Sequence, residues 1–306
     1  MHREQKFLAI ISLINKYFWK TKFVPLMSIL LPLAVMIIYF FVDNTSDAVD
    51  GLPPTLFVAS LPSFISLSIL PFLLMTLPQM HSDFKNSILL RRIKISNISK
   101  IEYLFLLYTF AATMSLVFVI ITFLIFLAFG NSTLFEPVGS NQLSFMQNID
   151  WLGVVYGILM LLISGISIGF FIGMISPNSL AAQMIGLGVF MISLVLGGQI
   201  IPLFLMSGID NIFIATLPSP LNYSLGILNT AIIPTFQGGI NNFTIIENNA
   251  FNLETFRVNG LPSDNPGLVL SIVYDGWQKM LNLIVPWFIF ALFTGFNYRF
   301  FKWSRR

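Results

Sequence analysis

Residues 103–129 read YLFLLYTFAATMSLVFVIITFLIFLAF, a stretch without a single charged side chain. An α-helix needs about 20 apolar residues to cross about 30 Å of hydrocarbon, so this stretch is long enough to span a membrane. Five further charge-free apolar runs lie at 23–42, 56–80, 151–175, 180–206 and 280–298. The sequence therefore predicts an all-α polytopic membrane protein with six transmembrane helices.

The composition supports this fold class. Hydrophobic residues make up 56% of the 306 residues, charged residues 9%, and the mean hydropathy is +0.84. Soluble domains carry about 25% charged residues, so this composition excludes a water-soluble enzyme and a nucleic-acid-binding module. With no cysteine and only His2 and His81, the chain offers no pattern of metal ligands. We expect no catalytic, cofactor-binding or metal-binding residue in this chain.

The basic residues predict the orientation of the spans. Of the 16 Lys and Arg residues, 14 lie before the first span, between the second and third, or after the sixth. The positive-inside rule assigns these three segments to the cytoplasm, which requires an even number of spans and places both termini inside. The lack of cysteine and the abundance of Asn, Ile and Phe favour a bacterial plasma membrane.

The whole chain, 1–306, is predicted to form a single transmembrane domain, with residues 207–279 on the outer side. Within this outer region, 209–233 is apolar but contains Pro218 and Pro220 and is followed by Pro234. The prolines favour a re-entrant or interfacial segment over a seventh span. The rest of the outer region is rich in Asn, Gly and Pro, which predicts mostly irregular structure.

Residues 1–22 precede the first span and contain an amphipathic pattern. Phe7, Ile11, Ile14 and Phe18 recur at helical spacing, and lysines lie on another face. This pattern is typical of a helix that lies in the membrane interface. The alternative is a simple basic segment that leads into the first span.

The cytoplasmic segment between the second and third spans mixes apolar and basic residues in one short helical stretch. The residues that form it are Ile88, Leu89, Leu90, Arg91, Arg92, Ile93 and Lys94. A loop that only connected two spans would not need these apolar side chains. The pattern predicts either a helix that docks into a groove of a soluble partner or a helix anchored to anionic lipid.

Gly165, Gly169 and Gly173 repeat every four residues along the fourth span. Small residues at this spacing let helices approach closely, which favours a role in helix packing over a role in lining a permeation path. Pro62, Pro71 and Pro78 predict kinks in the second span.

The predicted spans contain no acidic, basic or histidine side chain, which argues against an ion-coupled carrier. The chain also lacks the G-x-x-x-x-G-K-[ST] phosphate-binding loop, so any energy from ATP would have to come from another subunit.

Three segments resemble the permease subunits of the type-2 ABC transporter family. The first is the amphipathic segment 5–20, similar to the family's elbow helix. The second is 83–103, DFKNSILLRRIKISNISKIEY, which resembles the coupling helix and the entry to the third span. The third comprises GGQIIP at 197–202 and LPSPLNY at 217–223, similar to the end of the fifth span and the re-entrant segment. The aromatic and basic tail at 300–303 also fits.

The resemblance implies a half-transporter in which two permease subunits, identical or different, each rest on a cytosolic ABC ATPase that binds ATP and Mg²⁺. Residues 88–94 would then be the coupling helix. The implied activity is export of a hydrophobic or amphipathic cargo such as a lipid, drug or peptide. Two alternatives remain: a membrane scaffold or sensor with a functional outer loop, and a gradient-driven carrier.

Overall fold

The computed structural model describes residues 3–20, 23–45, 60–95, 97–130, 149–197, 218–232, 243–248, 253–258 and 276–301. Statements about structure refer to these residues. Parts of two predicted spans, 56–59 and 198–206, and most of the outer region lie outside them, as do the side chains of Ile88, Leu89, Arg91 and Arg92.

The chain is a helical, multi-pass membrane protein. Its described part contains five helical segments long and apolar enough to cross a membrane: Leu61–Asn86, Lys100–Phe129, Trp151–Ile175, Ser179–Leu196 and Met280–Phe300. They belong to α4 (Leu61–Pro71) with η1 (Phe72–Thr76) and α5 (Leu77–Asn86), to α7 (Lys100–Gly130), to α8 (Trp151–Ile175), to α9 (Ser179–Leu196) and to α13 (Gly276–Phe300). The first predicted span corresponds to α2 (Phe23–Thr45), within which the residues with described side chains include the apolar stretch Leu26–Tyr39.

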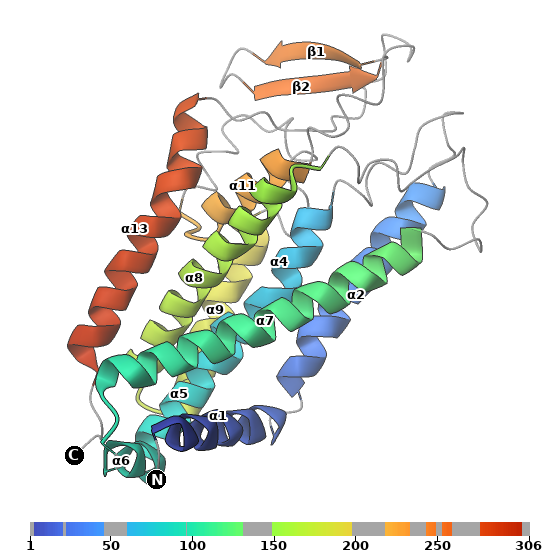
Figure 1. Ribbon diagram of the computed structural model, residues 1–306. Coiled ribbons are helices and arrows are strands. Elements are labelled where there is room, and N and C mark those ends of the chain that lie inside the picture. Colours follow the sequence, from blue (N-terminus) through green and yellow to red (C-terminus); the bar gives the residue numbers. More distant parts are fainter. Residues whose placement is uncertain are drawn as a thin grey trace.

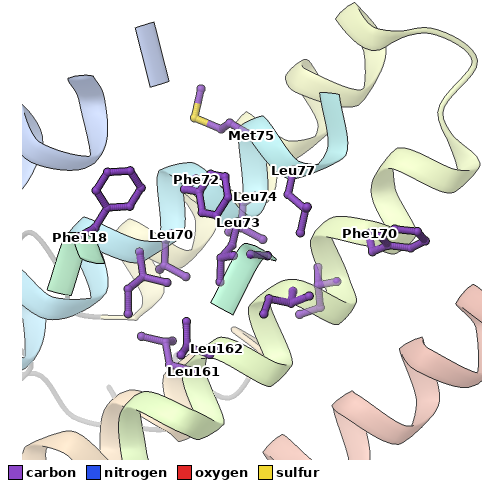
Figure 2. Packing of buried hydrophobic residues seen from close by; sticks show 14 of the residues in the cluster. Leu70, Phe72, Leu73, Leu74, Met75, Leu77, Phe118, Leu161, Leu162 and Phe170 are labelled. Carbon is purple, nitrogen blue, oxygen red and sulfur yellow. The ribbon is translucent and has the colours of Figure 1, made fainter. Parts of the chain in front are cut away.

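The second span forms the centre of the bundle. Helices α4, η1 and α5 follow one another without a break, and every residue of α4 and η1 is buried. Helices α2, α7, α8 and α9 pack around them. In Figure 2, Leu70, Leu73 and Leu74 of this central helix face Leu161 and Leu162 of α8.

A π turn, Phe72–Thr76, lies between Pro71 and Pro78 of the central helix, while Pro62 lies in the first turn of α4. Leu77 donates its backbone N–H to the carbonyl of Phe72, five residues back, so Leu73 loses its usual α-helical donor. Pro78 has no N–H to offer the carbonyl of Leu74. Two consecutive carbonyls in the centre of the bundle are therefore without their ordinary intrahelical hydrogen bonds.

Helix α13 is fixed against α7 and α8 by side-chain hydrogen bonds. The amide of Asn297 donates to the hydroxyl of Tyr108 and to the carbonyl of Ser167, both at 3.0 Å. Further along, the indole of Trp287 donates to the hydroxyl of Tyr156 at 3.0 Å. These bonds tie three spans together where side chains find few other polar partners.

The outer region contributes a short helix and a hairpin. Helix α11 (Asn222–Ile232) has 11 residues, about 16 Å at 1.5 Å per residue, and packs against α8, α13 and α4. A helix of this length is too short to cross the bilayer by itself. Strands β1 (Phe243–Asn248) and β2 (Leu253–Val258) pair antiparallel, with Phe243 opposite Val258. This hairpin is the one non-helical element in the described part, and its Thr, Ile and Phe residues favour strands.

Two short helices lie at the opposite end of the bundle from α11 (Figure 1). They are α1 (Arg3–Lys20) and α6 (Ile88–Ile95), and the last turn of α13 ends on the same side. This end brings together the amphipathic segments that the sequence singled out.

Candidate functional site

Local sequence signals define where α6 begins and ends. Ser87 breaks the helix with an extended conformation (ψ 167°) and donates its N–H to the carbonyl of Asp83 at 3.0 Å. Asn97 adopts a positive φ of 64°, which asparagine tolerates better than most residues. Ser99 and Glu102 then form a reciprocal capping box at the start of α7, with distances of 3.2 and 2.8 Å. Helix α6 thus lies between the C-terminus of α5 and the N-terminus of α7, both of which are defined by hydrogen bonds.

The described side chains of α6 divide into an inner and an outer face. Leu90 is fully buried and Ile93 is 6% exposed, both within the protein's own core. Ile95 is 78% exposed, and Lys94 is exposed beside it. Leu90 and Ile93, predicted as docking residues, are thus buried against the bundle, and the exposed described side chains of α6 are Lys94 and Ile95. Sequence periodicity alone could not separate these two uses of apolar residues on an amphipathic helix.

Helix α1 packs beside this junction. The hydroxyl of Tyr17 donates a hydrogen bond to the carboxylate of Asp83, and its ring meets Phe84 edge to face at 5.0 Å. Burial raises the pKa of the Tyr17 phenol above its ordinary value, and the hydrogen bond and negative charge of Asp83 raise it further. Tyr17 therefore keeps its proton and remains the donor at all physiological pH values.

The next residue of α1, Phe18, inserts into the bundle. Its side chain is fully buried and meets Phe72 of η1 at 5.2 Å and Phe110 of α7 at 5.9 Å, both edge to face. The amphipathic segment predicted from the sequence is thus a helix whose apolar side packs on the protein.

Lys85 joins the end of α5 to the end of α8. Its ammonium group donates to the carbonyls of Gly173, Met174 and Ser176 at 3.2, 2.7 and 2.7 Å. The last carbonyls of a helix lack intrahelical partners and carry the negative end of the helix dipole, so a lysine here satisfies both needs. The amide of Asn86 adds a bond of 3.3 Å to the carbonyl of Pro177, in the turn between α8 and α9.

His81 lies deeper in the same region. It is 1% exposed, its ring lies 4.0 Å from that of Phe170, and its Nδ1 is 3.4 Å from the hydroxyl of Tyr103. Phe301, just after α13, packs against both His81 and Tyr103. The histidine thus connects α5, α7, α8 and the end of α13.

Sequence reasoning did not single out His81, Asp83 or Lys85. It ended the second span at residue 80, whereas the central helix continues to Asn86 and carries these three polar residues into the packed bundle. These three residues follow an apolar run at intervals of two residues. That pattern is visible in the sequence, but it does not show which side chains or carbonyls they contact.

The three glycines of the fourth span all lie against the central helix. A Cβ atom at Gly165 would lie 2.7 Å from Leu73, and one at Gly173 would lie 2.6 Å from the carbonyl oxygen of Pro78. A Cβ at Gly169 would collide with the carbonyl oxygen of Leu73. Gly186 of α9 stands in the same relation to the carbonyl of Leu74. Gly169 and Gly186 therefore lie against the carbonyls of Leu73 and Leu74, which the π turn and Pro78 leave without their usual intrahelical donors.

No group of three or more His, Cys, Asp or Glu residues that could hold a metal ion occurs among the described residues. Comparisons with protein-family models, with curated proteins and with solved structures find no match. Class and function are therefore argued from the residues and their geometry.

Proposed function

We propose that this chain is the membrane-spanning permease subunit of an ATP-driven exporter and works with a separate cytosolic ABC ATPase. The observation that carries the proposal is the arrangement of α6. Its inner face is anchored by Leu90 and Ile93, while Lys94 and Ile95 are directed outward from the bundle. A short, firmly seated helix with an exposed apolar and basic end suits a groove on a soluble partner.

The proposed topology has six spans with both termini in the cytoplasm, α2 being the first span. In this arrangement α1, α6 and the end of α13 face the cytoplasm, in agreement with the distribution of basic residues. We place the protein in the plasma membrane of a bacterium. ATP and Mg²⁺ would bind to the partner ATPase, since this chain has no phosphate-binding loop.

The contacts around α6 offer a route by which movement of the ATPase could reach the spans. Ser87 connects α6 directly to α5, and Lys85 attaches α5 to the end of α8. Asp83 attaches the same helix to Tyr17 of α1. A displacement of α6 would therefore act on the central helix, on α8 and on α1 together.

A second permease subunit, identical or different, would complete the transporter. Helix α9 has a face of exposed apolar side chains that is suited to such pairing: Leu180, Met184, Ile185, Met191, Ile192 and Val195. The absence of charge from the apolar runs suits a hydrophobic or amphipathic cargo, such as a lipid, a drug or a peptide.

The docking role of α6 is tested by changing Ile95 to aspartate. Because Ile95 is exposed, Ile95→Asp should leave the fold intact but place a charge in the proposed groove. Loss of its apolar contact alone is worth about 1.5 to 3 kcal/mol, so recovery of the ATPase should fall by about tenfold or more. The measurement is quantitative mass spectrometry of the protein purified in mild detergent, together with its melting temperature.

The matched control is Leu152→Asp, the same type of change at a residue that is 81% exposed at the start of α8. This position lies at the other end of the bundle, so the ATPase should be retained. Recovery without an ATPase that carries a phosphate-binding loop would reject the permease proposal and favour a scaffold or a carrier. Retention of the ATPase by Ile95→Asp would reject α6 as the docking element.

The bond between Tyr17 and Asp83 is tested by Tyr17→Phe, which keeps the ring against Phe84 but removes the hydroxyl. A hydrogen bond to a charged group contributes about 1.5 to 3 kcal/mol, so the melting temperature should fall and α1 should become more accessible to protease. Tyr298→Phe, at a hydroxyl-bearing ring that is exposed on α13, should change neither. If Tyr17→Phe and Tyr298→Phe had the same melting temperature and the same protease accessibility of α1, the hydrogen bond of Tyr17 would not hold α1 in place.

A further inference from the structure

An apolar pocket opens between α4, α7, α8 and α11, near the first turns of α8. Its volume is about 220 Å³. All the described side chains that line it are aliphatic or aromatic, among them Ile120, Leu124, Trp151, Val155, Ile158 and Ile232. This pocket is far from the α5–α6 junction and is not used by the proposed coupling route.

The packing of α8 explains why the pocket exists. On one side of α8, Gly153 and Gly157 allow α11 to approach so closely that a Cβ at either position would lie 2.8 Å from Ala231 or Leu228. On another side, α7 crosses α8 obliquely (Figure 1). Side chains of α7 and α8 therefore line the space between the two helices without filling it.

The pocket opens toward the outside of the bundle at the level of the spans. Ile120, Leu124 and Val155 line it and are also 58, 59 and 64% exposed. All three belong to helices that are apolar enough to cross a membrane. In a membrane their exposed surface would face lipid hydrocarbon, since the described side chains beside them on the pocket wall are all apolar or aromatic.

Trp151 marks the shallow end of the pocket. It lies at the start of α8, where Asp150 caps the helix by accepting a hydrogen bond from the N–H of Gly153 at 3.0 Å. Tryptophan prefers the boundary between headgroups and hydrocarbon. The pocket therefore extends inward from that boundary, from Trp151 to Ile158, which is about two turns of helix.

We infer that this pocket binds one acyl chain of a phospholipid from the adjacent leaflet. The described residues of the lining expose no polar surface to the pocket, and purely apolar cavities stay dry. A cavity of roughly 150 Å³ accepts benzene, so 220 Å³ has room for a segment of a hydrocarbon chain. The surrounding solvent is itself hydrocarbon, which supplies such chains at high concentration.

The hydrocarbon around the pocket also determines which interactions can favour binding. A lipid chain gains nothing from leaving water here, because it is already in an apolar medium. Its gain comes from van der Waals contacts that an empty pocket would forfeit. We therefore expect a chain that exchanges with bulk lipid and is held by the shape of the pocket. This inference does not depend on an ATPase partner.

The test uses the full-length protein in vesicles of phosphatidylcholine that contain a lipid with a photoactivatable diazirine on its acyl chain. After illumination, mass spectrometry of peptides should show labelling concentrated on the pocket residues of α7 and α8. Val155→Trp, which places a large ring at the opening, should reduce labelling of the other pocket residues about fivefold or more. Leu159→Trp, one turn further on α8 and outside the lining, should leave it unchanged.

Ile120→Trp on α7 is a second blocking variant and should act like Val155→Trp, so the test does not rely on one variant folding. Labelling that follows exposure evenly over all lipid-facing helices, and that neither blocking variant reduces, would overturn the inference. The inference would also be overturned if a side chain of a second copy of this protein occupied the pocket. Because the chain has no native cysteine, a single Val155→Cys variant would report such a copy by efficient disulfide formation between two chains.

Discussion

Gly186→Ala is expected to prevent stable folding of this protein, and Gly169→Ala is expected to do the same. At each position the added Cβ would collide with a backbone carbonyl oxygen of the central helix, that of Leu74 or of Leu73. Overpacking typically costs 1 to 3 kcal/mol, and because backbone cannot move aside as a side chain can, we expect about 3 kcal/mol or more. Yield of monodisperse protein and its melting temperature in detergent measure the effect.

The chain provides a control on the same helix. Gly188 lies two residues from Gly186, and a Cβ there would meet nothing within 4 Å. Gly188→Ala should leave stability unchanged or raise it by about 0.5 to 1 kcal/mol, because alanine loses less backbone entropy than glycine in a helix. If Gly186→Ala and Gly188→Ala melted at the same temperature, the close approach of α9 to the central helix would be refuted.

The carbonyls of Leu73 and Leu74 lack their usual hydrogen-bond donors, which makes the close approach of the glycines important for stability. The π turn redirects the N–H of Leu77 to Phe72, and Pro78 has no N–H, so the carbonyls of Leu73 and Leu74 have lost their usual donors. Close approach of a glycine Cα–H is a weak compensation, worth about 0.5 to 1 kcal/mol in each case. An alanine would remove this contact and also force the helices apart.

Lys85→Met is expected to loosen the junction between α5 and α8. Methionine keeps the apolar stem but removes the charge and all three hydrogen bonds to the carbonyls of Gly173, Met174 and Ser176. Hydrogen bonds to charged groups contribute about 1.5 to 3 kcal/mol, and the junction is partly exposed, so we expect a loss of roughly 2 kcal/mol. Hydrogen exchange should rise at the end of α8 and the start of α9.

If the chain works with an ATPase, the same variant should also separate ATP hydrolysis from transport, because α6 would no longer act on α8. Lys85→Arg should restore much of the protection, since arginine keeps the charge and several donors. Lys94→Met removes a lysine from the exposed side of α6 and serves as the control for loss of charge. Unchanged exchange in Lys85→Met would mean that Lys85 does not hold the two helices together.

The positions of the spans could be predicted well because hydrophobic length is a local property. The predicted fourth span, 151–175, has the same bounds as α8, with Asp150 as its capping residue. The central helix continues beyond the end of the predicted second span, to Asn86. A polar residue at the end of an apolar run can face water or be buried by neighbouring helices, and the sequence does not distinguish the two for His81, Asp83 and Lys85.

The candidate site could be predicted only in outline. The alternation of apolar and basic residues indicated a helix at 88–94, and α6 occupies Ile88–Ile95. It did not indicate that Leu90 and Ile93 face the protein's own core while Ile95 faces outward. An amphipathic pattern defines an apolar face, but the bundle, the bilayer and a partner protein can each cover that face equally well.

The order of apolar and charged residues is enough to predict that this chain forms membrane-spanning helices and where most of them lie. In hydrocarbon every backbone polar group must be satisfied within the segment, and the thickness of the bilayer fixes the length that is required. Only the tertiary structure decided which helix is central, which glycines meet the carbonyls of Leu73 and Leu74, and where the apolar pocket opens. These features depend on contacts between residues far apart in the chain, and lipid-facing and protein-facing side chains are chemically alike.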